Sequence, residues 1–213
     1  MPADDPRDAA ATVVGELPDW THLPELPARG VAAGMLGRTA ALLADLYVDL
    51  QPAGWRIVDR PGLDHQRAVD LLRRDLDEFE EAAQGYTGLV KIQAAGPWTL
   101  SAGIELHRGD RMLSDPGAVR DLAQSLGEGL RRHAAEVARR VAGATVVVQL
   151  DEPSLPAVIA GHIRTASGFG ALREIPRPDA TDGLRTVIDA TGVPTGVHTC
   201  ASNPPLDVLR AAR

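Results

Sequence analysis

The stretch that decides the fold is Thr145-Val146-Val147-Val148-Gln149-Leu150, an almost uninterrupted apolar run that leads directly into Asp151-Glu152-Pro153. Such a run is typical of a strand buried on both faces of a parallel sheet. Shorter runs of the same character occupy residues 89–93 and 195–198. The three runs start about 50 residues apart, which leaves room for a helix and a long loop between them. This alternation predicts an α/β fold of the (β/α)8 TIM-barrel type.

Helical periodicity fills the intervals between the strands. Apolar residues recur at helical spacing over residues 64–83 and 119–141, and a shorter helix is expected at residues 182–190. Further towards the N-terminus, residues 39–46 predict a short helix and residues 55–58 a short strand. Prolines and glycines punctuate residues 1–38, which we expect to form a loop-rich entry. Because no linker divides the chain, residues 1–213 are expected to form a single domain.

Composition and charge exclude several classes of protein. The chain carries 22 Lys and Arg residues against 29 Asp and Glu residues, a formal net charge of −7, and its arginines are scattered among carboxylates. A nucleic-acid binder needs a gathered basic surface, so none is expected here. No apolar run approaches the roughly 18 residues of a membrane span, and no signal segment is evident. We therefore expect a cytoplasmic protein that does not bind membranes.

Polar residues gather directly after two of the predicted strands. Asp151 and Glu152 follow one, and His198 and Cys200 end the other. Sites in α/β folds form where parallel strands end, so these side chains are expected to meet. A carboxylate there can bind an ammonium group or act as a base, but it can also simply cap a helix. His198 and Cys200 can supply half of a tetrahedral zinc site, form a nucleophilic pair, or be a buried cysteine beside a structural histidine.

Other candidate residues carry weaker signals. Trp98, in the word Gly96-Pro97-Trp98-Thr99, predicts either a turn anchor or the wall of a substrate pocket. Glycine-rich phosphate loops are absent from the sequence. The remaining five histidines lack metal-ligand spacing and are expected on the surface or in loops; they are His22, His65, His107, His133 and His162.

The order of these short sequence motifs resembles that in the catalytic barrel of the cobalamin-independent methionine synthase family. The resemblance rests on residues 92–100, residues 148–155 and His198-Thr199-Cys200, together with residues 23–30, and is closest to short, single-barrel actinobacterial members. It implies a (β/α)8 barrel, shared with uroporphyrinogen decarboxylase, and a zinc-dependent methyl transfer to the thiol of homocysteine. On this resemblance His198 and Cys200 are zinc ligands, Asp151 holds the amino group of homocysteine, and Glu152 supports the site.

The sequence also departs from that family. The family's two further zinc ligands, a glutamate and a second cysteine, come from later strands, and Cys200 is the single cysteine here. Ala157 stands where long enzymes have a folate-binding glutamate, so the methyl donor is left open between methyltetrahydrofolate and a methylcorrinoid. We expect a truncated barrel with about five of its eight strand–helix units.

Two alternatives follow from these departures. The first is a metal-free enzyme resembling uroporphyrinogen decarboxylase, which would bind its substrate through arginines. The second is a non-catalytic, degenerate paralogue that binds a small amino acid. An incomplete barrel leaves sheet edges open, so a homo-oligomer that covers them is expected.

Overall fold

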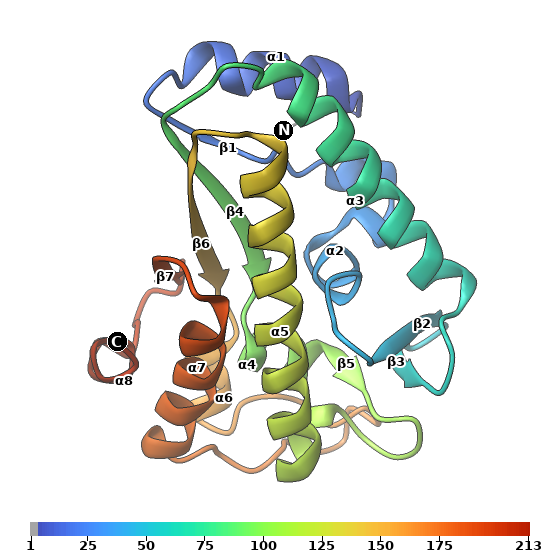
Figure 1. Ribbon diagram of the computed structural model, residues 1–213. Helices are drawn as coiled ribbons and strands as arrows, with labels where there is room; N and C mark the ends of the chain where they lie inside the picture. Colours follow the sequence, from blue (N-terminus) through green and yellow to red (C-terminus); the bar gives the residue numbers. More distant parts are fainter. Residues whose placement is uncertain (1–3) are drawn as a thin grey trace.

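The computed structural model describes residues 4–213 and contains two sheets packed against helices (Figure 1). Residues 1–3, which belong to the predicted N-terminal entry and to the predicted domain, lie outside the described residues. The elements in chain order are α1 (Pro6–Glu16), β1 (Trp20–His22), the 3-10 helices η1 (Pro27–Arg29) and η2 (Val31–Ala33), α2 (Met35–Ala40), β2 (Tyr47–Gln51), β3 (Gly54–Val58), α3 (Leu63–Ala82), β4 (Leu89–Ala95), α4 (Pro97–Gly103), β5 (Ile104–Glu105), η3 (Met112–Ser114), α5 (Pro116–Arg140), β6 (Thr145–Asp151), α6 (Leu155–Ile159), α7 (Arg177–Thr191), β7 (Thr195–His198) and α8 (Leu206–Ala211).

The main sheet has four parallel strands in the order β1-β4-β6-β7. β4 and β6 pair over seven residues each, from Leu89 opposite Thr145 to Ala95 opposite Asp151. β7 extends the sheet so that His198 lies opposite Asp151. Because the strands are parallel, all their carboxyl ends lie at one edge of the sheet.

The two faces of this sheet differ in chemistry. One face carries the buried side chains of Ile92, Val148 and Leu150, which belong to the same apolar cluster as Phe79 of α3 and Leu126 of α5. The opposite face carries half-buried polar residues from the alternate positions, among them Lys91, Gln93 and Gln149. Alternate residues of a strand point to opposite faces, so the sequence pattern sets this division. Helix α5 lies beside the sheet in Figure 1 and contacts β6.

A second, smaller sheet contains β2, β3 and β5 in that order. β2 and β3 form an antiparallel hairpin, and β5 adds to β3 in parallel. Trp55 of β3 is buried, and its ring lies so close to Gly37 of α2 that a Cβ on that glycine would overlap it. The small sheet is therefore packed onto the N-terminal helices.

The predicted α/β class with a parallel sheet is confirmed, and the strands at residues 89, 145 and 195 begin where the sequence places them. The described strands form an open sheet and do not close into a barrel. Helices α3 and α5 agree closely with the helices predicted over residues 64–83 and 119–141. No helix among residues 4–213 combines the length and the apolar character needed to cross a membrane.

Several local expectations were wrong. The predicted loop-rich entry over residues 1–38 contains an eleven-residue helix, α1, and strand β1. The helix predicted over residues 39–46 instead begins at Met35 and ends at Ala40. Asp45 has a φ of 59°, which a continuing right-handed helix excludes. His65 and His133 are buried rather than exposed, because they lie on the inward faces of α3 and α5.

Candidate functional site

The carboxyl ends of β4, β6 and β7 are joined by hydrogen bonds just where the polar residues begin. The Gly96 amide donates to the carbonyl oxygen of Asp151 at 2.9 Å, and the Glu152 amide donates to the carbonyl oxygen of His198 at 2.8 Å. Asp151 and His198 lie opposite each other in register on neighbouring strands. Of the four residues predicted to meet at this edge, Asp151 and His198 therefore lie side by side.

Asp151 is the last residue of β6, and 9 % of its surface is exposed. Its Oδ1 accepts a hydrogen bond from Nε2 of Gln149 at 2.7 Å. Within residues 4–213, no donor bonds to Oδ2, and this atom is not one of the fully buried unpaired atoms. Asp151 therefore has a carboxylate oxygen that can still accept a bond from a ligand.

Glu152 is fully buried, and its carboxylate faces the first turn of α4. Its Oε1 accepts from the Trp98 amide at 2.9 Å, and its Oε2 accepts from the Thr99 amide at 2.8 Å and the Thr99 hydroxyl at 2.6 Å. Burial raises the pKa of Glu152 to about 7, although the hydrogen bonds from Thr99 and Trp98 oppose that rise. Glu152 thus fastens the end of β6 to the first turn of α4.

Gly96 explains how Glu152 can lie so close to the neighbouring chain. A Cβ at position 96 would overlap the carboxylate of Glu152, while the φ of Gly96, −75°, is open to any residue. The glycine is therefore required by space and not by backbone conformation. The word Gly96-Pro97 lets α4 begin against the Glu152 side chain.

Trp98 lies on α4 within the helical layer. Its indole Nε1 donates to the carbonyl oxygen of Ala180 in α7 at 2.9 Å, and only 3 % of its surface is exposed. It lines a cavity of about 370 Å³ between α5 and α7, separate from the open face that carries Lys91 and His198. The structure thus does not bring Trp98 together with His198.

His198 and Cys200 are both exposed. β7 ends at His198, so Cys200 lies in the following loop and not at the end of the strand, where we expected it. In the part of the chain that the structure describes, no group of three or more His, Cys, Asp or Glu side chains is placed to hold a metal. The two residues therefore offer one imidazole and one thiol, half of a tetrahedral zinc set.

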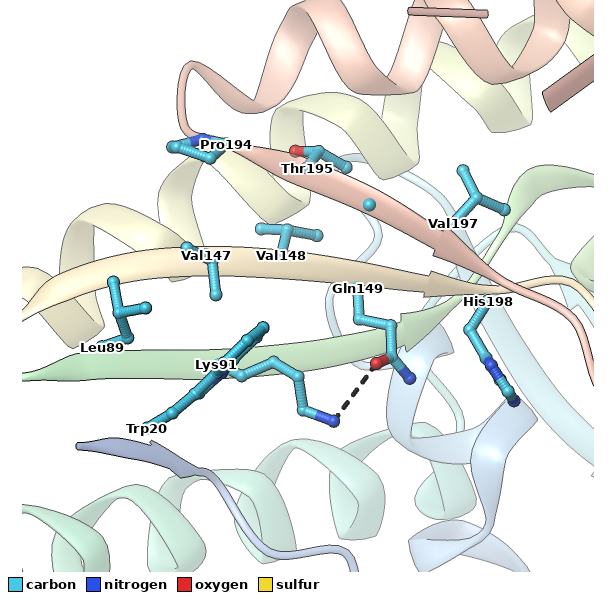
Figure 2. A pocket seen from close by; sticks show the side chains of 11 residues that line it. Trp20, Leu89, Lys91, Val147, Val148, Gln149, Pro194, Thr195, Val197 and His198 are labelled. Atoms are coloured by element: carbon cyan, nitrogen blue, oxygen red, sulfur yellow. Dashed lines mark hydrogen bonds between the residues drawn. The ribbon is translucent and has the colours of Figure 1, made fainter. Parts of the chain in front are cut away.

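The open face of the sheet lines a cavity of about 510 Å³ (Figure 2). In that view Lys91, Gln149 and His198 project to the same side of the sheet, with His198 nearest the carboxyl edge. Lys91 Nζ donates to Oε1 of Gln149 at 3.2 Å, the bond drawn in Figure 2. The cavity is lined by Trp20, Leu89, Lys91, Val147, Val148, Gln149, Pro194, Thr195, Gly196, Val197 and His198.

Sequence reasoning missed a second carboxylate near Asp151. Glu25 follows β1, is half-buried, and lies 3.6 Å from Nε of Arg38. Burial raises the pKa of Glu25, the charge of Arg38 lowers it, and the charge of Asp151 raises it again. The signal in the sequence was the segment Leu23-Pro24-Glu25-Leu26-Pro27, in which prolines and leucines flank a single acidic residue.

Gln93 and Gln149 were also missed as site residues. They lie opposite each other on β4 and β6, and Gln93 Nε2 donates to the carbonyl oxygen of Leu23 at 2.7 Å. The signal was a single polar residue at the same position in two otherwise apolar strands.

In comparisons with known protein families, with curated proteins and with solved structures, no match to this chain was found.

Proposed function

We propose that the protein is a methyltransferase that moves a methyl group to the thiol of homocysteine and uses zinc to do so. One observation carries the proposal: Asp151 and His198 lie in register on neighbouring parallel strands, and Cys200 follows His198 by two residues. A carboxylate and an imidazole thus lie at the edge of the sheet where α/β enzymes place their sites, and the thiol of Cys200 follows in the next loop.

In this proposal Asp151 binds the ammonium group of homocysteine through its available oxygen. Glu152 acts through the backbone, because its carboxylate is buried and holds the end of β6 against α4. Transfer forms a carbon–sulfur bond while the thiol loses its proton and the bond from the methyl group to its donor breaks. The donor is methyltetrahydrofolate or a methylcorrinoid.

His198 and Cys200 are the zinc ligands that this chain offers. Zinc, when bound, keeps a substrate thiol in the thiolate form at neutral pH. A catalytic zinc usually has three protein ligands and one open position, and residues 4–213 bring no third candidate side chain to the pair. The remaining positions would be taken by the substrate thiol and by a group other than His198 and Cys200.

We propose that the four-stranded sheet belongs to a (β/α)8 barrel. Two features of the four-stranded sheet support it: helices cover one face, and on the other face Lys91, Gln149 and Asp151 lead to the carboxyl edge, where (β/α)8 barrels have their sites. Edge strands β1 and β7 each pair on one side only. Trp20 of β1 is 56 % exposed. We propose that a second copy of the chain covers these edges in a homo-oligomer.

The proposal is tested by zinc titration of the purified protein and of three variants. We expect one zinc ion per chain in the wild type, and loss of that binding in Cys200→Ser and His198→Gln. His107→Gln is the matched control, because His107 is exposed and lies outside the strand ends. Unchanged zinc binding in Cys200→Ser would overturn the proposed metal site, and absence of methyl transfer to homocysteine with either donor would overturn the proposed reaction.

A second candidate is a non-catalytic protein that binds a small amino acid at Asp151. The absence of a third metal-binding side chain within residues 4–213 favours it. This candidate predicts that homocysteine binds with equal affinity in the presence of zinc and in the presence of a chelator. The methyltransferase instead predicts tighter binding with zinc, because the metal would hold the thiolate.

A further inference from the structure

Three polar side chains form a continuous chain of hydrogen bonds on the open face of the sheet. Lys91 Nζ donates to Oε1 of Gln149 at 3.2 Å, and Nε2 of Gln149 donates to Oδ1 of Asp151 at 2.7 Å. Gln149 and Asp151 are two residues apart on β6, so they share a face. Lys91 lies on β4 opposite Val147 and extends towards the carboxyl edge to reach Gln149 (Figure 2).

The order of charges along this chain fixes the direction of the Gln149 amide. Its oxygen faces an ammonium group, and its NH2 group faces a carboxylate. Rotation of the amide by half a turn would place NH2 against the Lys91 ammonium and the oxygen against the Asp151 carboxylate, so both bonds would be lost. Lys91 thereby holds Gln149 in the orientation that donates to Asp151.

Lys91 is half-buried, and its charge also lowers the pKa of Glu25. Its hydrogen bond goes to the amide of Gln149. Hydrogen bonds to charged groups are stronger than those between neutral groups, so the two ends of Gln149 are both held firmly. Asp151 is therefore held through Oδ1, and its Oδ2 can bind a ligand.

We propose that Lys91 and Gln149 are positioning residues that orient the Asp151 carboxylate towards the ammonium group of the substrate. This inference rests on the proposed function, which assigns the ammonium group to Asp151. Lys91 and Gln149 act through Asp151. Lys91 fixes the orientation of the Gln149 amide, and that amide fixes the orientation of the Asp151 carboxylate.

The test compares two ligands by calorimetry, L-homocysteine and 4-sulfanylbutanoate, which is the same molecule without the ammonium group. We expect Gln149→Leu to lower the preference for homocysteine by about tenfold, because one charge-assisted hydrogen bond is lost. Lys91→Met should lower it by about threefold, and Lys91→Arg, which can still donate to the amide, should restore it. Affinity for 4-sulfanylbutanoate should not change in any variant.

Thr145→Val is the matched control, because Thr145 is exposed at the opposite end of β6 on the same face. A general loss of structure would weaken the binding of both ligands, whereas a loss of positioning would weaken the binding of homocysteine alone. The inference is wrong if Gln149→Leu keeps the full preference for homocysteine.

A second measurement tests the chain of bonds without any ligand. The NMR signal of the Gln149 side-chain amide should shift in Asp151→Asn and in Lys91→Met, and should stay in place in Thr145→Val. If the signal keeps the same chemical shift in both variants, the inference is overturned. If that signal responds but the wild type binds the two ligands equally, the bond chain is supported and the proposed function is overturned.

Discussion

Glu152 is an acid that the fold places out of contact with water. Three donors on Trp98 and Thr99 hold its carboxylate, and its pKa is nevertheless raised to about 7 because burial disfavours the charge more strongly than those bonds favour it. The same group joins β6 to α4 directly beside Asp151. Its protonation state is therefore coupled to the stability of the sheet edge.

This coupling predicts an unusual pH dependence of stability. Between its ordinary pKa of 4.5 and the folded value of about 7, the native protein holds a proton on Glu152 that the unfolded chain releases. The contribution of Glu152 to the free energy of unfolding should therefore fall as the pH rises through this range, by up to about 3 kcal/mol. Denaturant unfolding of the wild type and of Glu152→Gln across this range measures it.

The comparison with the variant is needed because histidines act in the opposite direction. Burial lowers the pKa of His133 to about 3, so this residue destabilises the protein as the pH falls below 6.5. Glu152→Gln leaves His133 in place, and the difference between the two curves isolates Glu152. A difference that stays constant from pH 4.5 to pH 8 would show that Glu152 does not titrate in this range.

At the scale of single residues, sequence reasoning placed Asp151 and His198 at one edge because parallel strands bring their carboxyl ends together. It did not predict that Asp151 remains accessible to a ligand while its neighbour Glu152 is fully buried. Adjacent residues differ here because α4 packs over one of them, and that contact joins residues more than fifty positions apart. Spacing along one segment carries no information about such a contact.

Helix α3 is attached to the N-terminal segment by a buried carboxylate. Asp75, whose side chain is 3 % exposed, accepts bonds at 2.7 Å from both Arg29 and Arg38, which lie on η1 and α2. Arg38 also approaches Glu25 at 3.6 Å, so the same cluster reaches the neighbourhood of Asp151. Charges removed from water need their partners, which makes this contact sensitive to the loss of any member.

We expect Asp75→Asn to lower the free energy of unfolding by about 3 kcal/mol, because two largely buried guanidinium groups would lose their shared carboxylate. Asp70→Asn, an exposed position on the same helix, should change it by less than about 0.5 kcal/mol. Thermal and urea unfolding of both variants measure the effect. Equal stability of the two variants would mean that solvent fully compensates the two arginines for the loss of the Asp75 carboxylate.

The long elements were predictable from the sequence; of the short ones, strands β3 and β7 were predicted, whereas α1, β1 and α4 were not. α3 and α5 have many turns of apolar periodicity, and β6 is a continuous apolar run. α1 carried a usable signal, since the Asp5 side chain caps it and Pro6 occupies its first turn. The density of prolines after α1 concealed this signal. α4 has seven residues, and its position follows from Glu152 and α7, which a local pattern does not contain.

Over the whole molecule, the main sheet is open, and its two outer strands differ from its two inner ones. β4 and β6 pair on both sides, and on their helix-covered face Ile92 and Val148 are at most 2 % exposed. β7 pairs with β6 alone, and its four residues are half-buried or exposed. The fold class could be predicted because strand and helix alternate, but whether the sheet closes depends on contacts at β1 and β7 that the pattern does not specify.

This difference predicts how fast backbone amides exchange with solvent. In dilute protein, we expect peptides that cover residues 195–198 to exchange hydrogen much faster than peptides that cover β4 and β6, because edge strands open without breaking the apolar cluster. Hydrogen exchange followed by mass spectrometry measures this. If a second copy covers β7, raising the protein concentration should slow exchange at residues 195–198 and leave α3 unchanged, since α3 is already packed within one chain. Exchange at β7 that is fast at every concentration would contradict the proposed homo-oligomer, whereas protection equal to that of β4 in dilute protein would contradict the open edge itself.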